Sequence, residues 1–108
     1  MEVVWSELAL KSLEFILANI EMIWGEKVAQ KVFKQIQQEI ERLNVFPHLG
    51  YPYSDNLIAG ETVRVLTVNT HNRIFYFITQ NTIQIVVVWD NRQNPSMLYK
   101  ILSSFRNT

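Results

Sequence analysis

The sequence from Thr62 to Asp90 reads TVRVLTVNTHNRIFYFITQNTIQIVVVWD. Branched and aromatic residues fill three runs of it, and such residues are enriched in strands because they pack well on a pleated surface. Two short polar segments, Asn69–Asn72 and Thr79–Asn81, separate the runs. The pattern predicts two successive antiparallel hairpins built from strands at Thr62–Val68, Arg73–Ile78 and Thr82–Trp89.

The predicted register divides this block into two faces. Directly opposed residues of a hairpin share a face, so we first assume an even number of residues in each loop. One face is then almost wholly apolar and is expected to pack on helices: Val63, Val65, Thr67, Ile74, Tyr76, Ile78, Ile83, Ile85, Val87 and Trp89. The other face collects Arg64, Leu66, Val68, Arg73, Phe75, Phe77, Gln84, Val86, Val88 and Asp90. An odd loop or a bulge would change the parity and separate Asp90 from the arginines.

With that register, the second face predicts a binding surface. Arg64 and Arg73 would hold phosphates through bidentate contacts, and Arg92, just past the last strand, would reach the same face. Phe75 or Phe77 would pack against bases. The same mixture of apolar and cationic groups would equally suit an acidic or amphipathic partner segment.

A purely structural interpretation of the same residues stays open. The arginines would pair with Glu61, Asp90 or the C-terminus, as charged side chains on a solvated face commonly do. Asp90 would neutralise an arginine or cap the turn before Pro95.

Two helical patterns precede the strands. Ser6 is a good N-cap, and a short strand-prone segment, Glu2–Trp5, comes before it. Apolar residues then recur at helical spacing on both sides of Gly25: Ala9, Leu13, Ile16, Leu17, Ile20, Ile23 and Trp24 before it, and Val28, Ala29, Val32, Phe33, Ile36, Ile40 and Leu43 after it. Since the break at Gly25 is so short, we expect an antiparallel helical hairpin.

The remaining segments complete an α+β plan. Two prolines and a glycine end the second helix within Phe46–Pro52, and residues 53–60 have the composition of a loop. Asn94-Pro95 predicts the start of a short helix through about Phe105. The predicted order is β-α-α-β-β-β-α in one domain, residues 1–108, with the helices on one face of an antiparallel sheet.

Composition narrows the function classes. The chain has 108 residues, no cysteine and a formal net charge of zero, which argues against strong nonspecific attraction to nucleic acid. No apolar run is long enough to cross a bilayer, and the N-terminus lacks a signal-peptide pattern, so we expect a cytoplasmic protein. Two separated histidines and no glycine-rich phosphate loop predict neither a metal site nor a cofactor.

Several segments resemble the RelE/ParE family of bacterial toxins. Val4-Trp5-Ser6 is similar to the family's opening, and Ile40–Gly50 is similar to its "I-x-x-L-x-x-F-P-x-x-G" segment. Val63–Leu66 resembles "v-R-x-l", Asn72–Tyr76 resembles "y-R-i-x-Y", and Val86–Pro95 resembles the final strand with its "H-x-R-x-x-P" ending. The segments occur in the family's order over nearly the whole chain.

This resemblance implies the toxin of a type II toxin–antitoxin system, neutralised by a cognate antitoxin that wraps a tail onto it. RelE-like members cut messenger RNA on the ribosome, whereas ParE-like members poison DNA gyrase. By position, Arg64, Arg73 and Arg92 match the recurrent basic residues.

The departures favour the ParE-like branch. Asp90 stands where a histidine is common, and a carboxylate there is no near-neutral acid or base without a shifted pKa. Tyr51–Gly60 carries neither the glutamate nor the lysines that family nucleases use. We therefore expect a toxin that binds its target, with Arg64, Arg73, Phe75, Asp90 and Arg92 as the binding residues.

Two alternatives stay open. In a ribosome-dependent endoribonuclease, Arg64, Arg73 and Arg92 would form the catalytic set, and in a degenerate member toxicity would be lost. Assembly into a homo-oligomer is also left open by the sequence.

Overall fold

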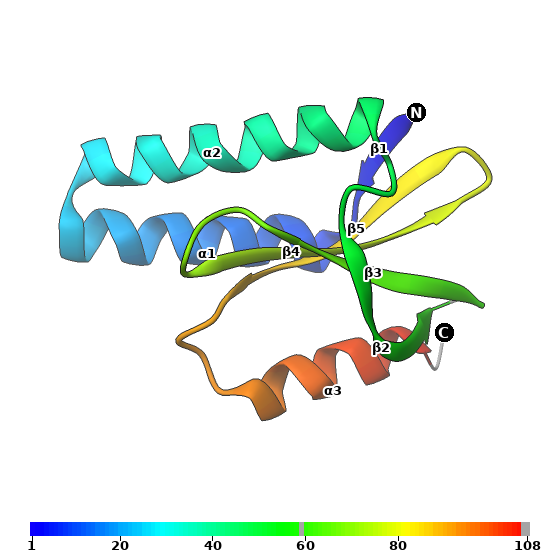
Figure 1. The fold of residues 1–108 in the computed structure, drawn as a ribbon. Coiled ribbons are helices and arrows are strands. Elements are labelled where there is room, and N and C mark those ends of the chain that lie inside the picture. Colours follow the sequence, from blue (N-terminus) through cyan, green and yellow to red (C-terminus); the bar gives the residue numbers. More distant parts are fainter. Residues whose placement is uncertain (59, 107–108) are drawn as a thin grey trace.

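The fold is an α+β arrangement in which helices cover both faces of one five-stranded sheet (Figure 1). A computed structural model describes residues 1–58 and 60–106, without the side chains of residues 54–57 and 106. The elements are β1 (Glu2–Trp5), α1 (Glu7–Trp24), α2 (Glu26–Val45), β2 (Tyr51–Ile58), β3 (Glu61–Thr67), β4 (Asn72–Thr79), β5 (Thr82–Asp90) and α3 (Pro95–Arg106).

The sheet has the strand order β1-β5-β4-β3-β2. The edge strand β1 runs parallel to β5, and the other neighbours are antiparallel. The sheet is therefore mixed. A parallel pair needs a long connection, and the α1–α2 hairpin lies in the chain between β1 and the other strands.

The helical hairpin forms as predicted. Ser6 caps α1 by accepting a hydrogen bond from the Ala9 N–H at 2.9 Å. Gly25 joins the two helices with a φ of +96°, a conformation that residues with a Cβ rarely adopt. Both helices bury one face against the sheet, which agrees with the periodicity of the sequence.

The strand β2 was not predicted. Tyr51–Ile58 contains proline and polar residues and was expected to be turn and loop, yet it pairs with β3 at its two ends, on either side of a shift in register. Pro52 is tolerated there because β2 lies at the edge of the sheet, where a missing N–H donor costs little.

The prediction that all helices lie on one face is wrong. The hairpin α1–α2 covers one face of the sheet, and α3 covers the other (Figure 1). Leu98 and Leu102 of α3 pack into a second core with Phe75 and Val87 of the sheet. This explains why residues 85–89 are buried without interruption, since a strand covered on both faces is apolar throughout.

The predicted faces are also wrong for β3, because the first loop has an odd number of residues. Val68 N–H bonds to the Asn72 carbonyl at 2.9 Å, which leaves three residues between them. The Asn69 side chain closes this turn by accepting hydrogen bonds from the N–H groups of His71 and Asn72. Arg64 consequently lies opposite Tyr76, and Thr67 lies opposite Arg73, so the two arginines occupy different faces.

A bulge in β5 shifts the third strand as well. The second turn, Gln80-Asn81, keeps the expected parity and has positive φ at both residues. The register then shifts, since Tyr76 pairs with Ile85 but Phe75 pairs with Val87. The N-terminal part of α1 holds this irregular stretch in place. The N-cap Ser6 donates a hydrogen bond from Oγ to the Val86 carbonyl, and Ser12 Oγ accepts one from the Val88 N–H. Asp90 is thereby moved to the face opposite Arg73.

Candidate functional site

Two polar turns meet at one end of the sheet. The Asn91 N–H donates to the His71 carbonyl at 2.7 Å, and Asn91 Nδ2 donates to the Thr70 carbonyl at 3.2 Å. The turn between β3 and β4 is thus joined to the turn between β5 and α3. We refer to residues 69–73 and 90–92 as the turn cluster.

Arg73 belongs to the turn cluster. Its Nε donates to Asn91 Oδ1, and its guanidinium lies 5.1 Å from the centroid of the Phe75 ring. The side chain is half-buried, on the face that α3 covers. Asn91 therefore links Arg73 to the segment that carries Asp90 and Arg92, although the sheet places Arg73 and Asp90 on opposite faces.

Asp90 and Arg92 form an ion pair. The carboxylate accepts hydrogen bonds from Arg92 N, Nε and Nη2 at 2.9, 3.0 and 2.7 Å. Burial by itself would raise the pKa of Asp90, but the hydrogen bonds from Arg92 and the charges of Arg92 and His71 bring that pKa below its ordinary value. Asp90 is therefore a carboxylate near neutral pH and cannot replace histidine as a proton donor.

Arg64 lies apart from the turn cluster. It is half-buried, and its Nη1 donates to the Gly50 carbonyl at 2.8 Å. Beside it, the Tyr76 hydroxyl accepts from Gly50 N and donates to the Pro47 carbonyl, both at 2.8 Å. Burial raises the pKa of Tyr76, which keeps the hydroxyl protonated for that donation. The predicted surface shared by three arginines does not form.

Phe75 does not offer a stacking surface. Its side chain is 0% exposed, and the ring of Tyr53 contacts it edge-on at a centroid distance of 5.0 Å. Phe77 is buried in the same core. The expectation that these rings pack against bases is wrong, because α3 covers the face on which they lie.

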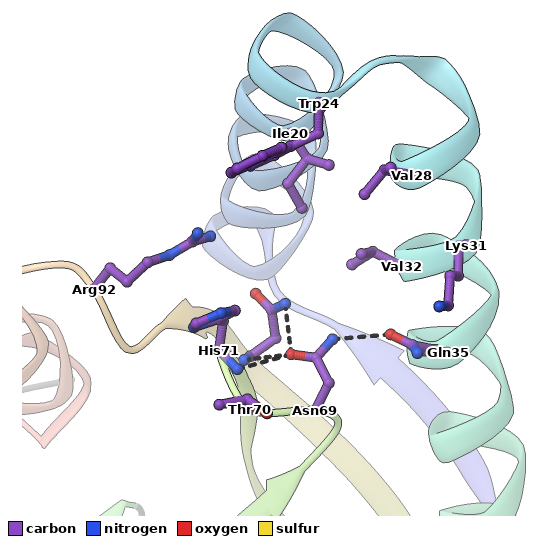
Figure 2. A pocket seen from close by; sticks show the side chains of 11 residues that line it. Ile20, Trp24, Val28, Lys31, Val32, Gln35, Asn69, Thr70, His71 and Arg92 are labelled. Atoms are coloured by element: carbon purple, nitrogen blue, oxygen red, sulfur yellow. Dashed lines mark hydrogen bonds between the residues drawn. The ribbon is translucent and has the colours of Figure 1, made fainter.

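A cavity of about 370 Å³ adjoins the turn cluster (Figure 2). It lies between the turn cluster and the end of the helical hairpin nearest Gly25. Figure 2 shows Arg92 and Lys31 on opposite sides, with Trp24 above and His71 below. Its lining residues are Ile20, Trp24, Val28, Lys31, Val32, Gln35, Asn69, Thr70, His71, Asn72 and Arg92.

Most of these lining residues were missed by sequence reasoning. Asn69 and Asn72 were recognised only as members of a polar loop, and Lys31 and Gln35 were not singled out. The one available signal was the pair of asparagines flanking a short hairpin turn, since asparagine side chains often bond to nearby backbone. Their contact with α2 depends on tertiary packing.

Metal-ion clusters and membrane-spanning helices are two further features that bear on function. Over the described part of the chain, no three side chains of histidine, cysteine, aspartate or glutamate are grouped in a way that could hold a metal ion. Within the same residues, no helix is long and apolar enough to span a membrane.

Comparison with known proteins identifies the family. The sequence model described as "ParE toxin of type II toxin-antitoxin system, parDE" matches residues 3–95. The chain belongs to the ParE toxin family. It is thus the toxin component of a type II toxin–antitoxin system, as the resemblance of its sequence segments implied.

Other comparisons bear on the fold of this ParE-family toxin. No curated protein matches the sequence. Among solved structures, it is similar to a chain from "Chromosomal ParDE TA system from P. aeruginosa", with a TM-score of 0.68 and 20% sequence identity. The match covers 83% of this chain and 95% of that chain. This likeness confirms the α+β fold of a ParE-like toxin.

Proposed function

We propose that this ParE-family toxin stops growth by binding an essential target, with DNA gyrase as the first candidate, and that it does not cleave RNA. The observation that supports this most strongly is the ion pair between Asp90 and Arg92. A nuclease needs a group that gives up a proton at neutral pH, and the lowered pKa of Asp90 makes it unsuited to that role.

The surface that supports target binding is the turn cluster. Arg92 has a side chain that is 49% exposed, and only part of its guanidinium is occupied by Asp90. Arg73 is half-buried and held by Asn91. Two cations on a rigid pair of turns suit recognition of an acidic surface, because little side-chain freedom is lost on binding. Arg64 is excluded from this surface, since it binds the Gly50 carbonyl.

An experiment in cells separates the mechanisms. Expression of the toxin alone should stop growth, produce filaments and leave purified gyrase trapped on DNA as a cleaved complex. Primer extension on ribosome-bound messages should show no new cuts. Cuts in those messages would refute binding-only action, and normal growth without either effect would indicate a degenerate member.

The arginines can be tested in the same assay. Replacing both Arg73 and Arg92 with alanine should abolish growth arrest while the protein stays folded. Arg42→Ala is the matched control, because Arg42 is an exposed arginine of α2 that pairs with Glu39. Full toxicity of the double variant would show that the target binds elsewhere.

A further inference from the structure

The cavity beside the turn cluster has an apolar wall and a polar floor. Ile20 and Trp24 from α1, with Val28 and Val32 from α2, form the wall. Of these, Trp24 is 62% exposed and Val28 is 40% exposed. Apolar side chains exposed together beside a cavity are typical of a docking site for another protein.

The floor contains an unusual group, the side-chain oxygen of Asn72. This residue is 2% exposed, and its Oδ1 has no hydrogen-bond partner. A buried acceptor without a donor is destabilising, because it has lost its hydrogen bonds to water and gained none in the protein. Such groups are rare in folded proteins, and each one calls for an explanation.

The orientation of the Asn72 amide is fixed by the backbone. Asn69 Oδ1 accepts from the N–H groups of His71 and Asn72, so this atom must be an oxygen. The Asn72 group that contacts it at 3.0 Å must then be the NH₂. Exchanging the two atoms of Asn72 would bring two acceptors together. Its oxygen therefore remains the unpaired atom of a residue that lines the cavity.

Two cationic side chains, Lys31 and Arg92, line the same cavity. Lys27, Lys31 and Lys34 recur along α2 at helical spacing, and they line an adjoining groove together with Gln30, Gln35 and Gln38. Lys31 lines both the groove and the cavity, and Arg92 lies across the cavity from it (Figure 2). A ligand here would meet the Lys31 ammonium on one side and, on the other, the part of the Arg92 guanidinium that Asp90 does not bind, so an acidic ligand is favoured.

We propose that this cavity is the socket for an acidic segment of the antitoxin, which inserts one N–H- or O–H-bearing side chain against Asn72 Oδ1. The proposal rests on the function proposed above, and it makes Asn72 a determinant of partner specificity. A volume of about 370 Å³ is at the small end of ligand pockets and fits an anchoring side chain. A partner without a donor would leave the buried oxygen unpaired and would bind more weakly.

A matched pair of tryptophan substitutions tests where the segment binds. Val28→Trp would fill the socket from its wall, where Val28 is 40% exposed. Val45→Trp makes the same change at the far end of α2, where Val45 is 68% exposed. The probe is the purified full-length product of the short reading frame adjacent to the toxin gene. Titration calorimetry should show at least tenfold weaker binding for Val28→Trp and less than a twofold change for Val45→Trp.

A charge reversal gives a second test that does not depend on tolerance of a bulky residue. Lys31→Glu should weaken binding at least tenfold and more strongly at low salt. Lys100→Glu, on the exposed side of α3, should change it less than twofold. Circular dichroism melts of all four variants report whether each one is folded. Equal binding by both members of each pair would overturn the socket proposal. So would the finding that the product of the adjacent reading frame does not bind the wild-type toxin.

A crystal structure of the complex tests the role of Asn72. A donor atom of the partner should lie within about 3.2 Å of Asn72 Oδ1. Removing that donor from the partner side chain without changing its shape should weaken binding about tenfold. If the complex holds only a water molecule at this oxygen, and no donor of the partner, the proposal is overturned.

Growth assays keep the two proposals distinguishable. If the wild-type toxin alone does not stop growth, the proposed function fails. The binding titrations still test whether the partner binds in the cavity. If it does stop growth and the neighbouring product rescues Val28→Trp as well as Val45→Trp, the socket fails and the proposed function stands.

Discussion

The loop after α2 and the turn cluster both join distant segments through polar groups, but only the loop is complete within the chain. At the loop, Tyr76 bonds to Gly50 and Pro47, and Arg64 bonds to Gly50. At the turn cluster, Asn72 Oδ1 stays unpaired and Arg92 is half-exposed. A network whose groups are paired fixes a structure, whereas an unpaired buried group leaves an acceptor that a further donor can use.

The largest expected effect tests how tightly the loop is held. A Cβ on Gly50 would lie 2.7 Å from both the Tyr76 hydroxyl and the Val65 carbonyl, and the latter belongs to a central part of the sheet. Gly50→Ala should therefore lower the free energy of unfolding by about 3 kcal/mol. Urea denaturation measures this, and a loss below about 1 kcal/mol would show that the loop can move away.

Removing the tyrosine hydroxyl should have the next largest effect. Tyr76→Phe keeps the ring but leaves the Gly50 N–H and the Pro47 carbonyl without their partner. The expected loss is about 1–3 kcal/mol, since at least one of these groups is buried. Stability equal to the wild type in thermal melts would contradict the structural role of this network.

Two arginine substitutions compare the regions directly. Arg64→Ala should cost about 1.5 kcal/mol of stability, because it removes a charged donor from the Gly50 carbonyl. Arg73→Ala should cost less than about 1 kcal/mol, from a contact with Phe75 and a bond to Asn91. Only Arg73→Ala should reduce toxicity in a growth assay of folded protein. The reverse pattern would exchange the roles assigned to the two arginines.

The smallest effect concerns pH and the ion pair at Asp90. Because the pKa of Asp90 in the folded state lies below its ordinary value of 3.8, the stability it contributes is present above that value. This stability is lost as pH falls through the lower folded-state pKa. The stability difference between the wild type and Asp90→Asn should therefore shrink between pH 5 and pH 2.5, by less than about 1 kcal/mol. A difference that stays constant in urea titrations would mean that the ion pair contributes nothing.

Much of the architecture could be predicted from local patterns. The helical hairpin, its break at Gly25, four of the strands and the helix after Asn94 follow from apolar spacing and capping, which act over a few residues. The family could also be predicted, since its segments occur in order along the chain. The edge strand β2 could not, because a segment with proline and polar residues becomes a strand only beside a neighbour that accepts it.

The sequence by itself determined which segments form the helices and every strand but β2, and which residues carry charge. Its resemblance to the family also indicated that Asp90 stands where a histidine is common. Only the tertiary structure decided which of these residues meet. One residue fewer in the first hairpin loop and one bulge at Val86 moved Arg64, Arg73 and Asp90 to different surroundings. The physical reason is that side chains alternate along a strand, so a shift of one residue reverses the face of every side chain beyond it.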